Sequence, residues 1–329
     1  TWKEDAVTEY EEAANATSAS GDGYTTKITN KVTPTLGKVT VSKRIPLSSA
    51  SFKYGDIDFT FTLKGTTIHK TEYKAAKTVK FTADTAADKK NIVTVGGKEY
   101  LQLSVTFEDL DWGEYKITES GSESRYEFDK ISGLTNATSG KESDGTPYVA
   151  FTVNHDKNEF TGTFENKPIP GKVKIVKYGN NKKKLAGVVF EIKKVTKGNN
   201  TEVVGTKTTD RNGEITFDDL DPGDYILTET KTVNGYSLLK DPVKFSIPLA
   251  LTKSEAAKRN ADTTKAKYDE KNDLYFFYEL TYDIDNEATL HIPTTGGKAN
   301  WLMYLPIALA AICIIGGGYY LTRKRRPVK

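Results

Sequence analysis

The chain has 329 residues, a formal net charge of +3 and a single cysteine, Cys313. This length is enough for two or three domains, and one cysteine excludes a disulfide framework. The basic excess lies mostly at the C-terminal end, so we predict no nucleic-acid partner. Tyr, Thr and Val are plentiful and Met is nearly absent, which favours strands over helices and predicts an all-β chain.

Residues 1–35 are predicted to be the tail of a truncated upstream domain followed by a linker. The segment is polar and acidic, with a turn rich in Ser, Gly and Asp at residues 18–23. A short strand, Tyr24–Asn30, ends on an asparagine before a proline-containing linker. Two later segments, Phe164–Asn166 and Ile284–Asn286, end in the same way. We therefore expect Asn30 to close a domain whose body lies before residue 1.

Residues 36–167 are predicted to form the first complete domain. Apolar and polar residues alternate along several of its segments, which is typical of half-buried strands. The expected strands are Lys38–Lys43, Ile57–Leu63, Tyr100–Phe107, Tyr115–Glu119, Tyr148–Val153 and Phe160–Phe164.

A stiff linker, Pro168–Gly171, leads into a second domain at residues 168–290. Its Asn212-Gly213 pair predicts a hairpin with a tight primed turn. A calcium loop was the alternative here, but the glycine comes too early for EF-hand spacing and no glutamate closes it. Thr252–Glu255 has the pattern of a capping box, so one short surface helix is expected there.

An internal repeat relates the two domains. Phe107–Glu119 aligns with Phe217–Glu229 without a gap, and the Phe, Leu, Asp, Gly, Tyr, Thr and Glu positions coincide. Each copy is a turn that leads into a strand ending on a glutamate. The two domains therefore share one design.

Period-two geometry places a lysine, a glutamate and an asparagine of each domain on apolar strand faces. The six residues are Lys43, Glu119 and Asn166 in the first domain and Lys177, Glu229 and Asn286 in the second. The alternative is that they are ordinary polar groups at strand ends facing water. Two matching trios at corresponding points favour a shared purpose, and buried charges should be paired or neutral because an unpaired one is costly.

Such a trio has a chemical use. Desolvation lowers the pKa of a lysine and raises the pKa of a glutamate. A neutral lysine amine is a nucleophile, and a protonated glutamate can hold and polarise an asparagine carboxamide. Attack by the amine then expels ammonia and leaves an intramolecular isopeptide bond. Each trio would react once, so we do not expect a turnover enzyme.

The last segment, residues 291–329, has three parts in a fixed order. A short extended pentapeptide consists of Ile292, Pro293, Thr294, Thr295 and Gly296. Residues 301–321 then lack any charged side chain and are long enough to cross a ~30 Å hydrocarbon core as one transmembrane helix. Arg323–Arg326 and Lys329 form a basic tail that should remain cytoplasmic. A plain membrane anchor is the alternative interpretation.

This order resembles the cell-wall sorting signal (LPXTG) of Gram-positive surface proteins, whose pattern is Leu-Pro-x-Thr-Gly, here with Ile292 in the first place. The resemblance implies that a sortase cuts between Thr295 and Gly296. It would then join the threonine carboxyl to an amine of the peptidoglycan or of a pilin lysine. The implied location is the cell wall, with membrane insertion before cleavage.

The second domain resembles collagen-adhesin B-type, prealbumin-like pilin domains. The resemblance is carried by Leu185–Phe190, Thr209–Gly213 and Tyr225–Tyr236, the last following the E-box of that family. Val233 departs from the pattern, since the family usually has proline there. The first domain is similar to streptococcal-type pilin isopeptide-linkage domains. Tandem Ig-like or prealbumin-like β-sandwiches are therefore expected.

Both families form Lys–Asn bonds assisted by an acidic residue. The resemblance implies the pairs Lys43–Asn166 with Glu119 and Lys177–Asn286 with Glu229. The neighbouring lysines that compete for the lysine positions are Lys38, Lys172 and Lys174.

We expect a pilin or adhesin stalk subunit that supports adhesion, with a sortase as partner and, through an upstream region, other pilins and a host ligand. The alternative is the wall-proximal spacer of a surface enzyme whose catalytic domain lies upstream. No Tyr-Pro-Lys motif is present, which favours a minor, basal or non-polymerised protein. His69, His155 and His291 have no metal-ligand spacing, so neither metal nor cofactor is predicted.

Overall fold

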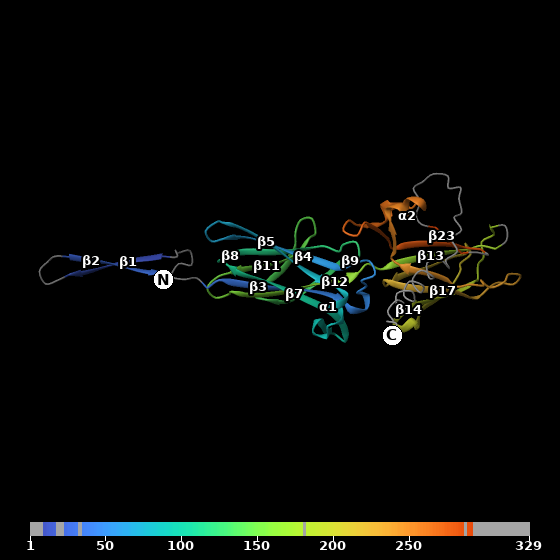
Figure 1. Cartoon of the computed structure of the whole chain (residues 1–329), viewed down its shortest axis with the longest axis horizontal. Helices are drawn as coiled ribbons and strands as arrows, with labels where there is room; N and C mark the ends of the chain where they lie inside the picture. The colour runs from blue at the N-terminus through green and yellow to red at the C-terminus, as the bar shows by residue number, and fades with distance from the viewer. Residues whose placement is uncertain (1–8, 18–22, 32–34, 180–181, 286–287, 292–329) are drawn as a thin grey trace, which may run out of the picture. The chain divides into compact units, whose positions relative to one another are not determined.

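The computed structural model describes residues 9–17, 23–31, 35–179, 182–285 and 288–291 (Figure 1). The chain divides into two compact units, the first up to Lys167 without residues 124–126, and the second from Pro168 onward with residues 124–126. Most of the described chain is strand, so the predicted all-β fold of tandem sandwiches is confirmed. The pentapeptide 292–296 and the predicted membrane helix lie outside the described residues. Among the helices that are described, none is long and apolar enough to cross a membrane.

Near the N-terminus, β1 (Glu9–Thr17) and β2 (Gly23–Lys31) form an antiparallel pair with Tyr10 opposite Asn30. The predicted strand at residues 24–30 lies within β2. Its partner β1 was not predicted, because its sequence lacks the alternation of apolar and polar residues that marks a strand.

Besides the β1–β2 pair, the first unit contains two five-stranded sheets. One has the order β10 (Thr138–Lys141), β11 (Pro147–Val153), β8 (Gly113–Ser120), β4 (Ile57–Thr67), β5 (Glu72–Phe81). The other has the order β6 (Ile92–Val95), β7 (Lys98–Leu110), β3 (Gly37–Pro46), β12 (Glu159–Pro168), β9 (Tyr126–Thr135). The short helices are α1 (Ala83–Ala87), η1 (Leu47–Ser49) and η2 (Lys89–Asn91).

The six strands predicted for this unit lie within β3, β4, β7, β8, β11 and β12. Aromatic side chains from the two sheets meet between them: the Phe61 and Phe164 ring centroids are 5.3 Å apart, and those of Phe151 and Phe160 are 4.5 Å apart. The inward-facing residues of the two sheets thus form one sandwich core. The first and last strands of the sandwich, β3 and β12, are parallel neighbours.

The second unit has two four-stranded sheets and a smaller one. The first four-stranded sheet has the order β16 (Glu214–Leu220), β13 (Gly171–Lys177), β22 (Glu279–Ile284), β23 (Ala288–His291). The second has the order β15 (Thr201–Thr208), β14 (Val189–Val195), β17 (Gly223–Lys231), β18 (Val243–Ile247). The smaller sheet has the order β19 (Leu249–Thr252), β21 (Leu274–Phe277), β20 (Lys267–Asp269). The helices are α2 (Lys253–Lys258), η4 (Lys197–Asn199) and η5 (Thr263–Lys265). Helix α2 begins with the predicted capping box, in which Thr252 and Glu255 bond reciprocally.

The hairpin predicted at Asn212-Gly213 is wrong. The strands on either side of this turn, β15 and β16, belong to different sheets, so the turn passes from one layer of the sandwich to the other. The Asp210 side chain accepts hydrogen bonds from the backbone N–H groups of Asn212 (2.8 Å) and Glu214 (2.9 Å), and the Asp210 N–H donates to the Glu214 carbonyl at 3.0 Å. These bonds close the turn tightly, although β15 and β16 do not pair as strands. Gly213 has φ +71°, and a Cβ there would lie 2.8 Å from the Lys177 carbonyl oxygen.

The internal repeat is a repeat of structure. The Tyr115 hydroxyl donates to the Asp111 carbonyl at 2.8 Å, and the Tyr225 hydroxyl donates to the Asp221 carbonyl at 2.5 Å. Both rings stack on a phenylalanine with a centroid distance of 5.5 Å. The turn and strand are therefore built in the same way in both units.

Candidate cross-linking sites

Strand register brings the predicted lysine of each unit to a corresponding position, beside a parallel strand. In the parallel pair β3–β12, Lys43 lies opposite Phe164, and Asn166 follows two residues later on the same face. In the parallel pair β13–β22, Lys177 lies opposite Ile284. Two residues further is Asn286, which lies outside the described residues.

The two glutamates also occupy matching positions, on the sheet that faces the lysine strand. Glu119 of β8 is opposite Phe61 of β4, and Glu229 of β17 is opposite Phe190 of β14. Each lysine is therefore on the first strand of one sheet, and each glutamate points across the core from the other sheet.

In the first unit all three predicted residues are in contact. Lys43 Nζ donates to Glu119 Oε1 at 2.9 Å and to Oε2 at 2.8 Å. Asn166 Nδ2 donates to Glu119 Oε1 at 2.9 Å. Glu119 thus binds the amine and the carboxamide at the same carboxyl group, which brings together the two groups that would react.

Burial changes the acid–base properties of this cluster. The Lys43 side chain is fully buried and lies over the Phe59 ring, with Nζ 4.1 Å from the centroid. Desolvation lowers the pKa of the Lys43 amine to about 8, although Glu119 acts in the opposite direction. Burial likewise raises the pKa of the Glu119 carboxyl, against the effect of Lys43. Both shifts favour the neutral pair of amine and carboxylic acid.

The carbonyl oxygen of Asn166 is the remaining reactive atom. It is buried and has no hydrogen-bond partner among the described residues. Half a turn of the carboxamide would exchange Oδ1 with Nδ2 and place Oδ1 beside Glu119 Oε1. A protonated Glu119 could then donate to it and polarise the carbonyl carbon for attack by the amine.

In the second unit, Lys177 Nζ is 3.0 Å from Glu229 Oε2, and both side chains are at most 5% exposed. The same Nζ donates to the Asp285 carbonyl at 3.4 Å, immediately before Asn286 in the chain. Glu229 Oε2 also accepts the backbone N–H of Leu239 at 3.3 Å. Within the described part of the chain, Oε1 of Glu229 is buried without a partner, so one carboxyl oxygen is left for another group.

The competing lysines lie on the outer faces of their strands. Lys38, Lys172 and Lys174 are each 40 to 50% exposed and pair with Glu159, Asp218 and Glu214. None of the three contacts a predicted catalytic glutamate through these pairs. The geometry therefore singles out Lys43 and Lys177.

Two contacts of these sites were not predicted from the sequence. The Phe59 ring beside Lys43 belongs to an alternating strand whose every second residue is apolar, so nothing in the sequence marks it. The Leu239 N–H on Glu229 comes from a loop after β17, and a backbone donor has no signature in the sequence.

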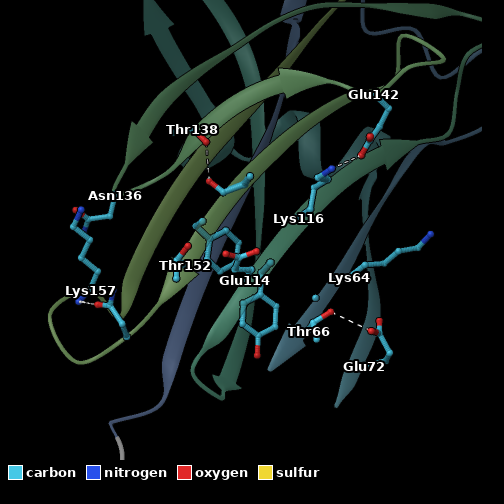
Figure 2. A pocket seen from close by; sticks show the side chains of 15 residues that line it. Lys64, Thr66, Glu72, Glu114, Lys116, Asn136, Thr138, Glu142, Thr152 and Lys157 are labelled. Carbon is cyan, nitrogen blue, oxygen red and sulfur yellow. Dashed lines mark hydrogen bonds and ion pairs between the residues drawn. The ribbon is translucent and has the colours of Figure 1, made fainter. Parts of the chain in front are cut away.

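A shallow groove of about 620 Å³ lies elsewhere on the first unit, on the outward face of the sheet that contains β8 and β11 (Figure 2). Most of its lining residues have polar side chains, and several of these bond to one another, such as Lys116 with Glu142 at 2.7 Å and Thr66 with Glu72 at 3.1 Å. None of the three cross-link candidates lines it. Over the described residues, no group of His, Cys, Asp and Glu is arranged to hold a metal ion.

Comparison with known proteins gives one family match. The family model "SpaA: Prealbumin-like fold domain" matches residues 171–262, which fall in the second unit. No curated protein sequence matches the chain.

Several solved structures match parts of the chain at low sequence identity. The chain is 13% identical to the Bacillus anthracis TIE protein over 73% of this chain, with a TM-score of 0.37, and spans 38% of that protein. It is 15% identical to a C-terminal fragment of the pilus adhesin SpaC from Lactobacillus rhamnosus GG, covering 80% of this chain and 100% of the fragment, with a TM-score of 0.36. GBS52, a minor pilin of Streptococcus agalactiae, is 16% identical over 80% of this chain and 100% of its own, with a TM-score of 0.24.

Proposed function

We propose that this chain is a pilin or adhesin stalk subunit of a Gram-positive cell surface, stabilised by one Lys–Asn isopeptide bond in each unit and attached to the wall by a sortase at Thr295. The observation that carries the proposal is the buried cluster of Lys43, Glu119 and Asn166 between the first and last strands of a sandwich. The repeat of the Lys–Glu contact at Lys177 and Glu229 supports it. So does the match of residues 171–262 to a prealbumin-like domain.

The proposed reaction in the first unit balances without a cofactor. A proton passes from the Lys43 ammonium to Glu119, and the neutral amine attacks the Asn166 side-chain carbonyl carbon. Glu119 donates a hydrogen bond to the carbonyl oxygen, and then a proton to the departing nitrogen. The carbon–nitrogen bond of the carboxamide breaks and ammonia leaves. The Lys43 nitrogen gives a second proton to the Glu119 carboxylate and keeps one hydrogen in the new amide. The second unit would react in the same way through Lys177, Glu229 and Asn286.

The bond would stabilise each sandwich by closing a long loop. A cross-link between residues roughly 120 apart is worth about 5 kcal/mol if loop-closure entropy acts as it does for disulfides. The proposed function needs this constraint because the chain has no disulfide and its single cysteine lies at position 313.

The intact mass of the full chain tests the cross-links. Each bond removes one ammonia, about 17 Da, so two bonds predict a deficit of about 34 Da. Glu119→Ala and Glu229→Ala should each restore half of it, and tryptic digestion should lose the corresponding branched peptide. Glu142→Gln and Glu214→Gln are matched controls, since each removes an acidic partner of surface lysines and should leave the deficit unchanged. An unshifted wild-type mass would overturn the cross-linking proposal.

Incubation with a sortase and an amine nucleophile tests the attachment. The expected product is the chain ending at Thr295 joined to the amine, with residues 296–329 released. Thr295→Ala should abolish it, whereas Thr294→Ala, at the variable position of the sorting pattern, should leave it. Cleavage at another position, or none, would overturn attachment at Thr295 and leave the cross-links untouched.

A further inference from the structure

The outer face of the β3–β7 pair carries a ladder of side-chain hydrogen bonds. Thr40 bonds to Thr106 at 2.9 Å, and Ser42 bonds to Ser104 at 2.8 Å, each pair being directly opposite in the register. The next rung is Arg44, whose Nε and Nη2 both donate to Gln102 Oε1, at 3.0 and 2.7 Å. These rungs fix β3 against β7.

The Arg44 rung alone continues across the sheet. Arg44 Nη1 donates to Glu165 Oε1 of β12 at 2.9 Å, and Ser132 of β9 donates to the same oxygen. Gln102, Arg44, Glu165 and Ser132 thus form a chain of contacts over four adjacent strands, here called the outer-face belt. The Arg44 and Glu165 side chains are only 13% and 6% exposed, so this ion pair is shielded from water.

The outer-face belt lies on the opposite face of β3 and β12 from the cross-linking site. Arg44 follows Lys43, Glu165 precedes Asn166, and Arg44 and Glu165 are direct partners in the parallel register. Neighbouring residues of a strand point to opposite faces. The ion pair on the outer face therefore fixes the alignment of the two residues that must meet on the inner face.

We propose that Arg44 and Glu165 are positioning residues for the isopeptide bond of the first unit: their ion pair sets the β3–β12 register that brings Lys43 and Asn166 together at Glu119. This inference rests on the proposed function. It assigns the belt a role in the rate of bond formation, beyond any contribution to the stability of the sheet.

The register is the property that the reaction needs most. A slip of one residue would turn Asn166 to the outer face, and a slip of two would move it about 7 Å along β3. Asn166 lies near the end of β12, which ends at Pro168, so few ladder bonds beyond it resist fraying. On the outer face, the contacts of Glu165 with Arg44 and Ser132 hold this end of β12 in place.

The second unit has no equivalent belt among its described residues. The position before Asn286 is Asp285, whose carboxylate pairs with Lys182 at 3.0 Å. Those side chains are 28% and 59% exposed, and Lys182 comes from the turn after β13 and not from a neighbouring strand. An exposed pair of this kind contributes little, so bond formation in the second unit should depend less on it.

If Glu165 acted only through its charge, removing that charge would change the rate of bond formation in the opposite direction. Its negative charge is one of the influences that raise the pKa of Lys43. Removing the charge would leave more of the amine neutral and speed the attack. A positioning role predicts that the same change slows it. The sign of the rate change therefore separates the two roles.

The test follows bond formation in the full chain after cell-free synthesis, with timed quenching and mass spectrometry of the Lys43–Asn166 and Lys177–Asn286 peptides. Glu165→Gln should slow the first bond by about tenfold to a hundredfold, the range expected when a reacting group is misplaced by about 1 Å. The second bond in the same molecule is the internal control, and Glu142→Gln is the matched surface control. Arg44→Gln should be slow, and Arg44→Lys, which keeps a cation at Glu165, should recover much of the rate.

A first bond that forms in Glu165→Gln at the wild-type rate or faster overturns the inference. If this variant loses the protease-resistant first unit, Arg44→Gln/Glu165→Gln takes its place, since it removes the ion pair without leaving an unpaired charge. A slowed first bond in this double variant supports the role, and a first bond at the wild-type rate overturns it. A wild-type chain that forms neither bond overturns the proposed function itself, which is a separate outcome.

Discussion

The two units place a lysine and a glutamate in the same register but surround them differently. In the first, Glu119 binds Lys43 through both carboxylate oxygens, and the outer-face belt joins β3 and β12 on their opposite face. In the second, Glu229 holds Lys177 through one oxygen, which it shares with the Leu239 N–H of a loop. The site therefore depends on the strand framework that the units share, while loops and outer faces are free to differ.

The largest expected effect is on the buried charge pair. Lys43→Ala removes the cross-link and leaves Glu119 buried without its cation, whereas the double variant Lys43→Met/Glu119→Met removes the cross-link and both charges. The single variant should be less stable than the double by about 3–5 kcal/mol, the cost of breaking a buried pair. Urea unfolding read by hydrogen exchange in each unit measures this. Equal stabilities would mean that Glu119 is not a buried charge in the folded chain.

The pH dependence of the first unit is the next largest effect. In Asn166→Ala no bond can form, and burial still lowers the pKa of Lys43 to about 8 from 10.5. Between these values the unfolded chain binds more protons than the folded one, so the free energy of unfolding rises with pH across this window, by at most about 3 kcal/mol. The reference is Lys43→Met/Asn166→Ala, which lacks the group. A flat difference between the two from pH 8 to 10.5 would contradict it.

Gly65 of the first unit and Gly205 of the second differ in how much space each leaves for a larger side chain. A Cβ at Gly65 would lie 2.3 Å from the Tyr115 ring, whereas one at Gly205 would meet the Phe217 ring at 3.6 Å, an ordinary contact. Gly65→Ala should cost about 1–3 kcal/mol, as overpacking does. Gly205→Ala should be neutral or slightly stabilising. Denaturation of both variants tests this, and equal losses would contradict the difference in packing.

The smallest expected effect should be the same in both units. Tyr115→Phe and Tyr225→Phe each remove one hydroxyl-to-carbonyl hydrogen bond and keep the stacked ring. Each should lower the free energy of unfolding of its own unit by about 1 kcal/mol. Unequal losses would show that the repeat has diverged in its energetics although its geometry is the same.

Much of this architecture could be predicted from the sequence. Strands with one apolar face, such as β3 and β4, follow from period-two alternation, and the matching Phe107–Glu119 and Phe217–Glu229 segments show that the design is repeated. The chemistry of the Lys43 cluster follows from residue type and strand face. These features are local, so a single segment contains the signal.

The features that were missed depend on partners far away in the chain. Strand β5 is an edge strand with most of its residues exposed, so it lacks an apolar face. The turn at Asn212-Gly213 has local hairpin chemistry, but β16 pairs with β13 and not with β15. The Arg44–Glu165 pair joins residues that are 121 positions apart, and ordinary charged residues on outer faces give no hint of such a partner.

The parallel pairing of first and last strands also determines how the chain would carry tension. With the proposed bonds in place, a force pulling on both ends enters the first unit along β3, crosses at Lys43 to Asn166, and leaves through residues 167–177 to the next bond at Lys177. The loops enclosed by the two bonds would bear no load. Between the two cross-links only about ten residues could lengthen, to at most about 36 Å, so the part of the chain from residue 43 to residue 286 would behave as a nearly inextensible tether.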